Sequence, residues 1–172
     1  KVSKASGKRG FATGVSIVDI NADGRMDLYI CKSGRFTNPD LRRNELLVNQ
    51  GNNAEGIPIF VEQAQKYGLD IPAYSTQAAF FDYDRDGDLD LFLINHGIDT
   101  YEVSEVPRLQ KESDQLMGEM LFRNENGFFV EVTQAAGIVN NKLGFALGLA
   151  IGDLNNDDYP DVYVSNDYSG KD

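Results

Sequence analysis

The amino-acid sequence predicts an all-β protein built from β-propeller blades, each a sheet of four short antiparallel strands. An acidic loop flanked by β-prone residues occurs three times, and successive loops start 63 and 71 residues apart. Short apolar runs separated by tight turns follow the first two loops. A strand-rich repeat of about 70 residues with tight turns is typical of a propeller blade. The 172 residues hold about two and a half such units, so we expect one propeller segment spanning 1–172.

The second acidic loop shows the repeat most clearly. In FFDYDRDGDLDLFLI, residues 80–94, apolar runs enter and leave the loop, and acids occupy every second position between them: Asp82, Asp84, Asp86, Asp88 and Asp90. Carboxylates at this density repel one another unless a cation lies among them. Oxygen ligands with a glycine at the sixth position, Gly87, suit Ca²⁺, because glycine readily adopts the positive φ of a tight metal loop.

The other two loops follow the same pattern. The first reads VDINADGRMDLYI, from residue 18, and the third reads GDLNNDDYPDVYV, from residue 152. An EF-hand is disfavoured, because it needs a bidentate Glu at position twelve between two helices. Position twelve is Ile30, Leu93 or Val164 here, and β-prone residues follow each loop. Three acidic hairpin turns without metal remain the alternative.

The units are expected at 11–70, 74–139 and 143–172, and the third is incomplete. The predicted strands are 11–20, 28–32, 45–49 and 57–62 in the first unit, 76–81, 91–95, 120–124 and 128–132 in the second, and 143–151 and 162–172 in the third. The unit endings FVEQAQKYGL and FVEVTQAAGI align with an offset of 69. The insertion at 99–118 predicts a short helix after Pro107, with Leu109, Leu116 and Met117 on one side. It is either a partner-contact loop or a solvated excursion.

Composition narrows the class of protein. The net charge is −11 and the pI about 4.5, and the three loops hold three, five and four of the 27 acidic residues. Nucleic acid and anionic membranes are therefore disfavoured as partners. The single cysteine, Cys31, is expected to be buried in a strand, and no apolar run reaches the ~18 residues of a membrane span. Calcium loops fill where calcium is abundant, which favours an extracellular, periplasmic or cell-surface location with any signal outside this chain.

These motifs resemble FG-GAP/VCBS repeats, the calcium-loop blades also found in integrin α-chain propellers. The resemblance is closest to secreted proteins that combine such repeats with an ASPIC/UnbV region. It rests on VDINADGRMDLYI, FDYDRDGDLDLFLINHG, GDLNNDDYPDVYVSND and the blade ending LFRNENGFFVEVTQAAGI. The literal FG and GAP tripeptides are absent, and the third loop has Asp158 where the others have glycine, so its site is expected to be the weakest.

The resemblance implies two to three Ca²⁺ ions. Positions one, three, five and nine would supply side-chain oxygens, and position seven would supply a backbone carbonyl. The implied ligands are Asp19, Asn21, Asp23, Arg25 and Asp27 in the first loop, Asp82, Asp84, Asp86, Asp88 and Asp90 in the second, and Asp153, Asn155, Asp157, Tyr159 and Asp161 in the third.

The leading hypothesis is a calcium-binding extracellular interaction or adhesion module, in which the metal is structural and the partner is a protein or a glycan. The alternative is a segment of a calcium-dependent propeller enzyme acting on polysaccharide. His96, the only histidine, is better explained as a structural residue, so no catalytic residue is predicted. Tyr74, Tyr101 and Tyr168 form either a glycan platform or scattered core and surface positions. Two and a half blades cannot close into a propeller, so we expect either a segment of a larger propeller or open blade faces through which copies could self-associate.

Overall fold

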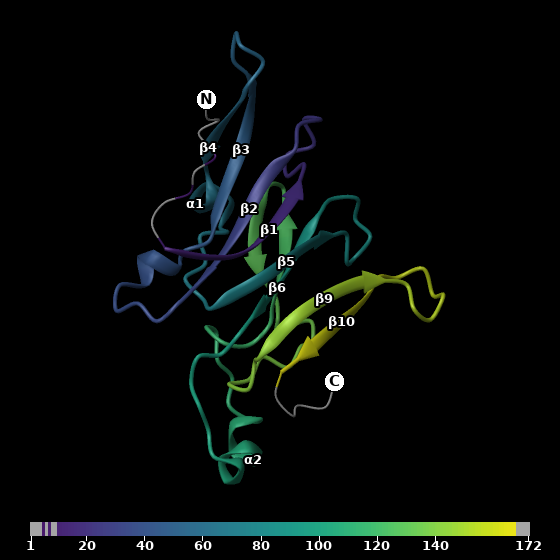
Figure 1. Ribbon diagram of the computed structural model, residues 1–172. Coiled ribbons are helices and arrows are strands. Elements are labelled where there is room, and N and C mark those ends of the chain that lie inside the picture. The colour runs from purple at the N-terminus through teal and green to yellow at the C-terminus, as the bar shows by residue number, and fades with distance from the viewer. Residues whose placement is uncertain (1–4, 6, 8–9, 168–172) are drawn as a thin grey trace.

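The computed structural model describes residues 5, 7 and 10–167, and the regular secondary structure in this part of the chain is mostly β-strand, with a few single helical turns (Figure 1). The strands form three antiparallel sheets in sequential order, which we call blades 1, 2 and 3. Blade 1 contains β1 (Phe11–Val18), β2 (Asp27–Ser33), β3 (Glu45–Asn52) and β4 (Pro58–Glu62). Blade 2 contains β5 (Ser75–Phe81), β6 (Asp90–Asn95), β7 (Met120–Glu125) and β8 (Phe128–Glu131). Blade 3 contains β9 (Ala146–Gly152) and β10 (Asp161–Asn166). The all-β prediction of four-stranded antiparallel blades is confirmed.

The three blades share one strand register, which defines equivalent positions. The last pair of each first hairpin is Val18 with Asp27 in blade 1, Phe81 with Asp90 in blade 2, and Gly152 with Asp161 in blade 3. The third strand then pairs in the same way in both complete blades, because Leu28 lies opposite Leu47 and Leu91 opposite Phe122. A residue of one blade can therefore be compared directly with its counterpart in the next.

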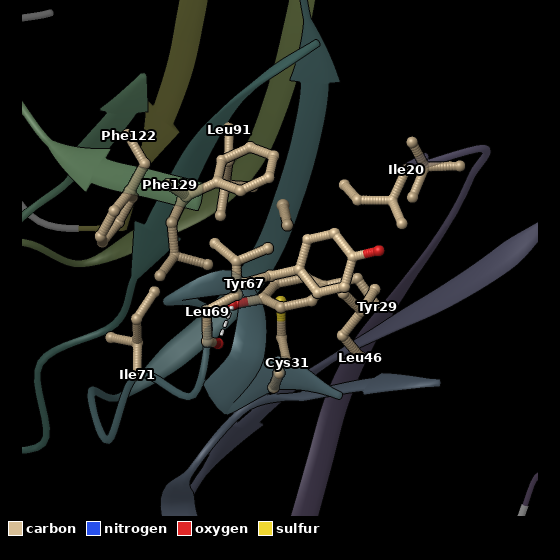
Figure 2. Packing of buried hydrophobic residues seen from close by; sticks show 14 of the residues in the cluster. Ile20, Tyr29, Cys31, Leu46, Tyr67, Leu69, Ile71, Leu91, Phe122 and Phe129 are labelled. Atoms are coloured by element: carbon tan, nitrogen blue, oxygen red, sulfur yellow. Dashed lines mark hydrogen bonds between the residues drawn. The ribbon is translucent and has the colours of Figure 1, made fainter. Parts of the chain in front are cut away.

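The main core lies between blades 1 and 2. Tyr29 and Cys31 on β2 pack with Leu46 on β3 against the apolar face of blade 2 (Figure 2). The rings of Tyr29 and Phe80 meet edge to face, with centroids 5.6 Å apart. The Tyr29 hydroxyl donates a hydrogen bond of 3.1 Å to the Leu69 carbonyl. Cys31 is buried as predicted, and burial raises the pKa of its thiol to about 12.

A smaller core joins blades 2 and 3. Phe92 and Ile94 on β6 and Leu121 on β7 pack with Ala146, Leu149 and Val164 of blade 3. Every residue of β6 is buried, since this strand has a blade on each side. The outward face of β1 has no such cover among the described residues, and Val15 and Ile17 are 60% and 68% exposed.

Each complete blade ends in a tight turn that the sequence alignment predicted only as a closing segment. In blade 1 it is the single helical turn α1 (Ala64–Tyr67), which ends at Gly68 with φ of 75°. Gly137 in blade 2 has the same φ of 75°. The Ala64 N–H donates to the Glu62 carboxylate at 2.7 Å, and Thr133 N–H donates to Glu131 at 2.8 Å. The offset of 69 residues thus corresponds to a repeated backbone conformation.

Two connections carry the remaining helical turns. The 3₁₀ turn η1 (Pro39–Arg42) follows β2, while η2 (Val103–Glu105) and α2 (Val106–Leu109) lie in the insertion after β6. The predicted helix therefore starts one residue before Pro107, and it has a single turn. Leu109 and Met117 are buried, whereas Leu116 is 38% exposed. The expectation that these three side chains share one side is wrong, because the helix ends at Leu109 and the chain turns before Leu116.

Blade 1 contains an ion pair that the sequence did not reveal. Lys32 on β2 donates a hydrogen bond from its ammonium to the Glu45 carboxylate on β3, and each side chain is only 3% exposed. The backbone N–H of Lys32 donates to the Asn44 side chain at 2.8 Å. The pair therefore holds β2 against β3 on the face of blade 1 that points away from blade 2.

Candidate metal centre

The three acidic loops all connect the first two strands of a blade, and they lie along one side of the molecule (Figure 1). Position one organises each loop. The carboxylate of Asp19 accepts N–H groups from positions five and six at 3.0 and 2.8 Å. The corresponding distances are 3.1 and 3.0 Å at Asp82, and 3.2 and 3.0 Å at Asp153. The three loops therefore have the same backbone scaffold.

The scaffold requires two left-handed residues in each loop. Position six is Gly24 with φ of 80°, Gly87 with φ of 99°, and Asp158 with φ of 68°. Asp158 thus adopts the conformation for which the other loops use glycine, at a backbone cost that Asp bears better than most residues. Position four is also left-handed, in Ala22, Arg85 and Asn156, and the sequence analysis missed this.

The second loop gathers the most negative charge. One carboxylate oxygen from each of Asp82, Asp84 and Asp86 lies within 4.8 Å of the other two. Burial and the neighbouring carboxylates raise the pKa of Asp88, and its Oδ1 atom is buried without a hydrogen-bond partner among the described residues. Oxygen donors at this spacing, together with an unpartnered carboxylate oxygen, fit a hard divalent cation such as Ca²⁺.

The first and third loops replace the position-three carboxylate with an amide. Asn21 donates to Asp23 at 3.0 Å, and Asn155 donates to Asp157 at 2.9 Å. In the first loop the Arg25 guanidinium also pairs with Asp23 at 2.7 Å. Side-chain donors therefore already occupy carboxylate oxygens in these two loops, and Arg25 partly neutralises the first, which makes the second loop the strongest cation candidate.

The aspartate at position nine holds the first two loops to their blades. Asp90 is fully buried and accepts N–H groups from Tyr83 at 3.0 Å and from Asn124 on β7 at 2.8 Å. Asp27 does the same with Ile20 and with Asn49 on β3, at 3.1 and 2.7 Å. Burial raises the pKa of Asp90 to about 6, although the two N–H groups act in the opposite direction. A carboxylate has about four lone-pair sites, so Asp90 can still bind a metal ion after accepting these two hydrogen bonds. Its role as a metal ligand stays a prediction.

The contribution of the third strand was not found from sequence. Asn49 and Asn124 occupy the same position in β3 and β7. Besides its N–H bond, each donates from its side-chain amide to the carbonyl of position eight, Met26 or Leu89, at 3.2 Å. The recurring asparagine in LLVN and LFRN was the available signal, but only the pairing of the strands shows that it faces the loop.

The second and third loops are coupled. The Arg85 guanidinium lies over the Tyr159 ring, 5.0 Å from its centroid. The pKa of Asp157 is lowered by the Tyr159 N–H, the Asn155 amide and the positive charge of Arg85. The predicted position-seven residues are Arg25, Asp88 and Tyr159. Each donates its backbone N–H to the carboxylate at position five of its own loop, at 2.9, 3.1 and 2.9 Å.

The other candidate residues lie apart from these loops. The His96 ring contacts Phe145 edge to face at 5.4 Å, and its buried Nδ1 atom has no hydrogen-bond partner among the described residues. Arg42 covers the Tyr74 ring at 4.5 Å, and Tyr101 packs against Phe145 at 6.4 Å. Tyr168 lies outside the described residues.

Fold and loops together define a propeller-type protein with acidic inter-strand loops. Comparison with known families agrees, because residues 19–93 match the family model described as FG-GAP-like repeat. This match, which begins at the first acidic loop, supports an FG-GAP repeat protein, and such repeats are typical of extracellular proteins. No curated protein matches the chain significantly. Within the described residues, no helix is long and apolar enough to span a membrane.

Proposed function

We propose that the chain is a calcium-binding extracellular interaction module in which the ions stabilise the loops rather than take part in catalysis. The observation that carries this proposal is the convergence of Asp82, Asp84 and Asp86 within 4.8 Å in the second loop. Three carboxylates at such spacing repel one another, and a divalent cation would turn this repulsion into attraction. Because the loop joins β5 to β6 and is tied to β7 through Asp90, bound metal would stabilise the whole blade.

The loops would present the binding surface. They lie on one side of the molecule, and Arg85 against Tyr159 connects two of them (Figure 1). This proposal includes a protein or glycan partner for an adhesive surface. It also includes association with an ASPIC/UnbV region and self-association through the open blade faces. We assign no catalytic role to His96, and an enzymatic function would predict that His96→Ala abolishes turnover of a polysaccharide.

Calcium binding is tested by isothermal titration calorimetry of chelator-treated protein with Ca²⁺ and, separately, Mg²⁺. The second loop is removed as a site by Asp82→Ala combined with Asp86→Ala. The matched control is Asp99→Asn, which removes an exposed acid outside the loops. We expect the double variant to lose the tightest Ca²⁺ site, and the control to keep it.

The same proteins are then followed by thermal unfolding. Ca²⁺ at about 100 times the Kd of one site adds about 2.7 kcal/mol to the free energy of unfolding. That corresponds to about 5–11 °C for a protein of this size. An equal response to Mg²⁺, or a full response in the double variant, would contradict the assignment. Glycan or protein binding that persists in excess chelator would contradict a calcium-dependent adhesive role.

A further inference from the structure

Arg85, at position four of the second acidic loop, contacts the third loop instead of the acids beside it. Its guanidinium lies 5.0 Å from the centroid of the Tyr159 ring. Its neighbours in the chain are Asp84 and Asp86, whose carboxylate oxygens belong to the converging cluster. Among residues 10–167, no hydrogen bond or ion pair joins Arg85 to either of these acids. Its positive charge is therefore held outside the cluster that would bind a cation.

The first loop shows what an arginine does in such a loop when it is not held elsewhere. Arg25, at position seven, folds back and pairs with Asp23 of its own loop at 2.7 Å. A guanidinium on a flexible stem matches the geometry of a carboxylate, and such pairs form readily where acids are close. Arg85 lies beside more acids than Arg25 does, so its position over Tyr159 needs a cause.

The third loop supplies that cause, and the first two loops have no equivalent contact. Tyr159 offers an aromatic face, to which a guanidinium is attracted. The positive charge of Arg85 also attracts the Asp157 carboxylate of the same loop. Between the first and second loops, the residues at positions four and seven are Ala22 and Asp88, which cannot form a cation–π contact. The attraction is therefore particular to the second and third loops.

We propose that Tyr159 is a positioning residue for the cation site of the second loop, because its ring holds the Arg85 guanidinium away from the carboxylates that bind the cation. This inference rests on the proposed function, since it concerns the affinity of that loop for a divalent cation such as Ca²⁺. Without the ring, Arg85 pairs with an acid of its own loop, and an incoming cation has to displace it. The resulting loss of affinity cannot exceed what the ring contact contributes.

Isothermal titration calorimetry of the chelator-treated chain with Ca²⁺ measures this effect. The tightest site is assigned to the second loop by its loss in the variant that combines Asp82→Ala with Asp86→Ala. Tyr159→Ala should raise the Kd of this site about two- to fivefold, the size expected for an exposed cation–π contact. Tyr159→Phe should keep the Kd, because the contact uses the ring and not the hydroxyl. The matched control Leu154→Ala removes another exposed side chain of the third loop and should also keep it.

A double-mutant cycle separates this role from a general effect on the third loop. In an Arg85→Ala background, Tyr159→Ala should leave the Kd unchanged, because the competing charge is absent. Alanine suits this position, since Ala22 occupies position four of the first loop with φ of 54°, close to the 64° of Arg85. An unchanged Kd in Tyr159→Ala, or equal weakening in both backgrounds, would overturn the inference.

A second measurement needs no metal. In excess chelator, the Tyr159 ring current should shift the NMR signals of the Arg85 side-chain protons upfield. Tyr159→Ala should abolish this shift and Tyr159→Phe should retain it, while thermal unfolding in chelator checks that each variant folds. Wild-type protein that binds Ca²⁺ in the second loop but lacks the shift would overturn this inference and leave the proposed function intact. Wild-type protein that shows the shift but binds no Ca²⁺ would overturn the proposed function, and this inference with it.

Discussion

Removal of one member of the buried Lys32–Glu45 pair should be among the most destabilising single changes in the protein. Each side chain is 3% exposed, and Glu45 lies opposite Ile30 in the register that joins β2 to β3. Glu45→Ala removes the carboxylate that pairs with the Lys32 ammonium at a site where water has little access, and breaking a buried ion pair in this way costs about 3–5 kcal/mol. For a chain of this length the melting temperature should fall by about 6–20 °C.

A double-mutant cycle separates the pair from its surroundings. Lys32→Met and Glu45→Leu should each destabilise strongly alone, whereas together they replace the ions by apolar groups of similar volume, a change that is often neutral or stabilising. Urea unfolding of the wild type, the two single variants and the double variant in excess chelator gives their four free energies of unfolding. All four are fitted with one common dependence on urea concentration. If either single variant loses less than about 1 kcal/mol, the value expected for an exposed pair, the inference that the pair is desolvated is wrong.

Two further predictions concern titratable groups away from the loops. Burial raises the pKa of Glu119 above its ordinary value of 4.5, so the folded state holds this proton more tightly than the unfolded state. The resulting stability is present below pH 4.5 and is lost as the pH rises through the pKa of Glu119 in the folded state. Glu119→Gln should remove this part of the pH dependence of the free energy of urea unfolding. An unchanged pH profile would contradict the prediction. The Cys31 thiol, with a pKa of about 12 and no exposed surface, should react with a thiol reagent at pH 8 only after unfolding, so rapid labelling of native protein would refute its burial.

The sequence by itself determined most of the secondary structure. Strands such as Met120–Glu125 begin at the predicted residue, because the short apolar run that starts there parallels the one at 46–49 and is a local signal for a buried strand. The φ of 99° at Gly87 was likewise expected, since glycine reports a local backbone requirement. The sequence also singled out Asp82, Asp84 and Asp86, which the structure brings together, because their spacing within one short loop is local information.

Only the tertiary structure decided how the loops are attached and which charged residues meet in the interior. The bonds from Asn49 and Asn124 to Asp27 and Asp90 join residues 22 and 34 positions apart, and no local pattern specifies such pairing. The same holds for the buried partners Lys32 and Glu45, which the sequence shows only as two charged residues.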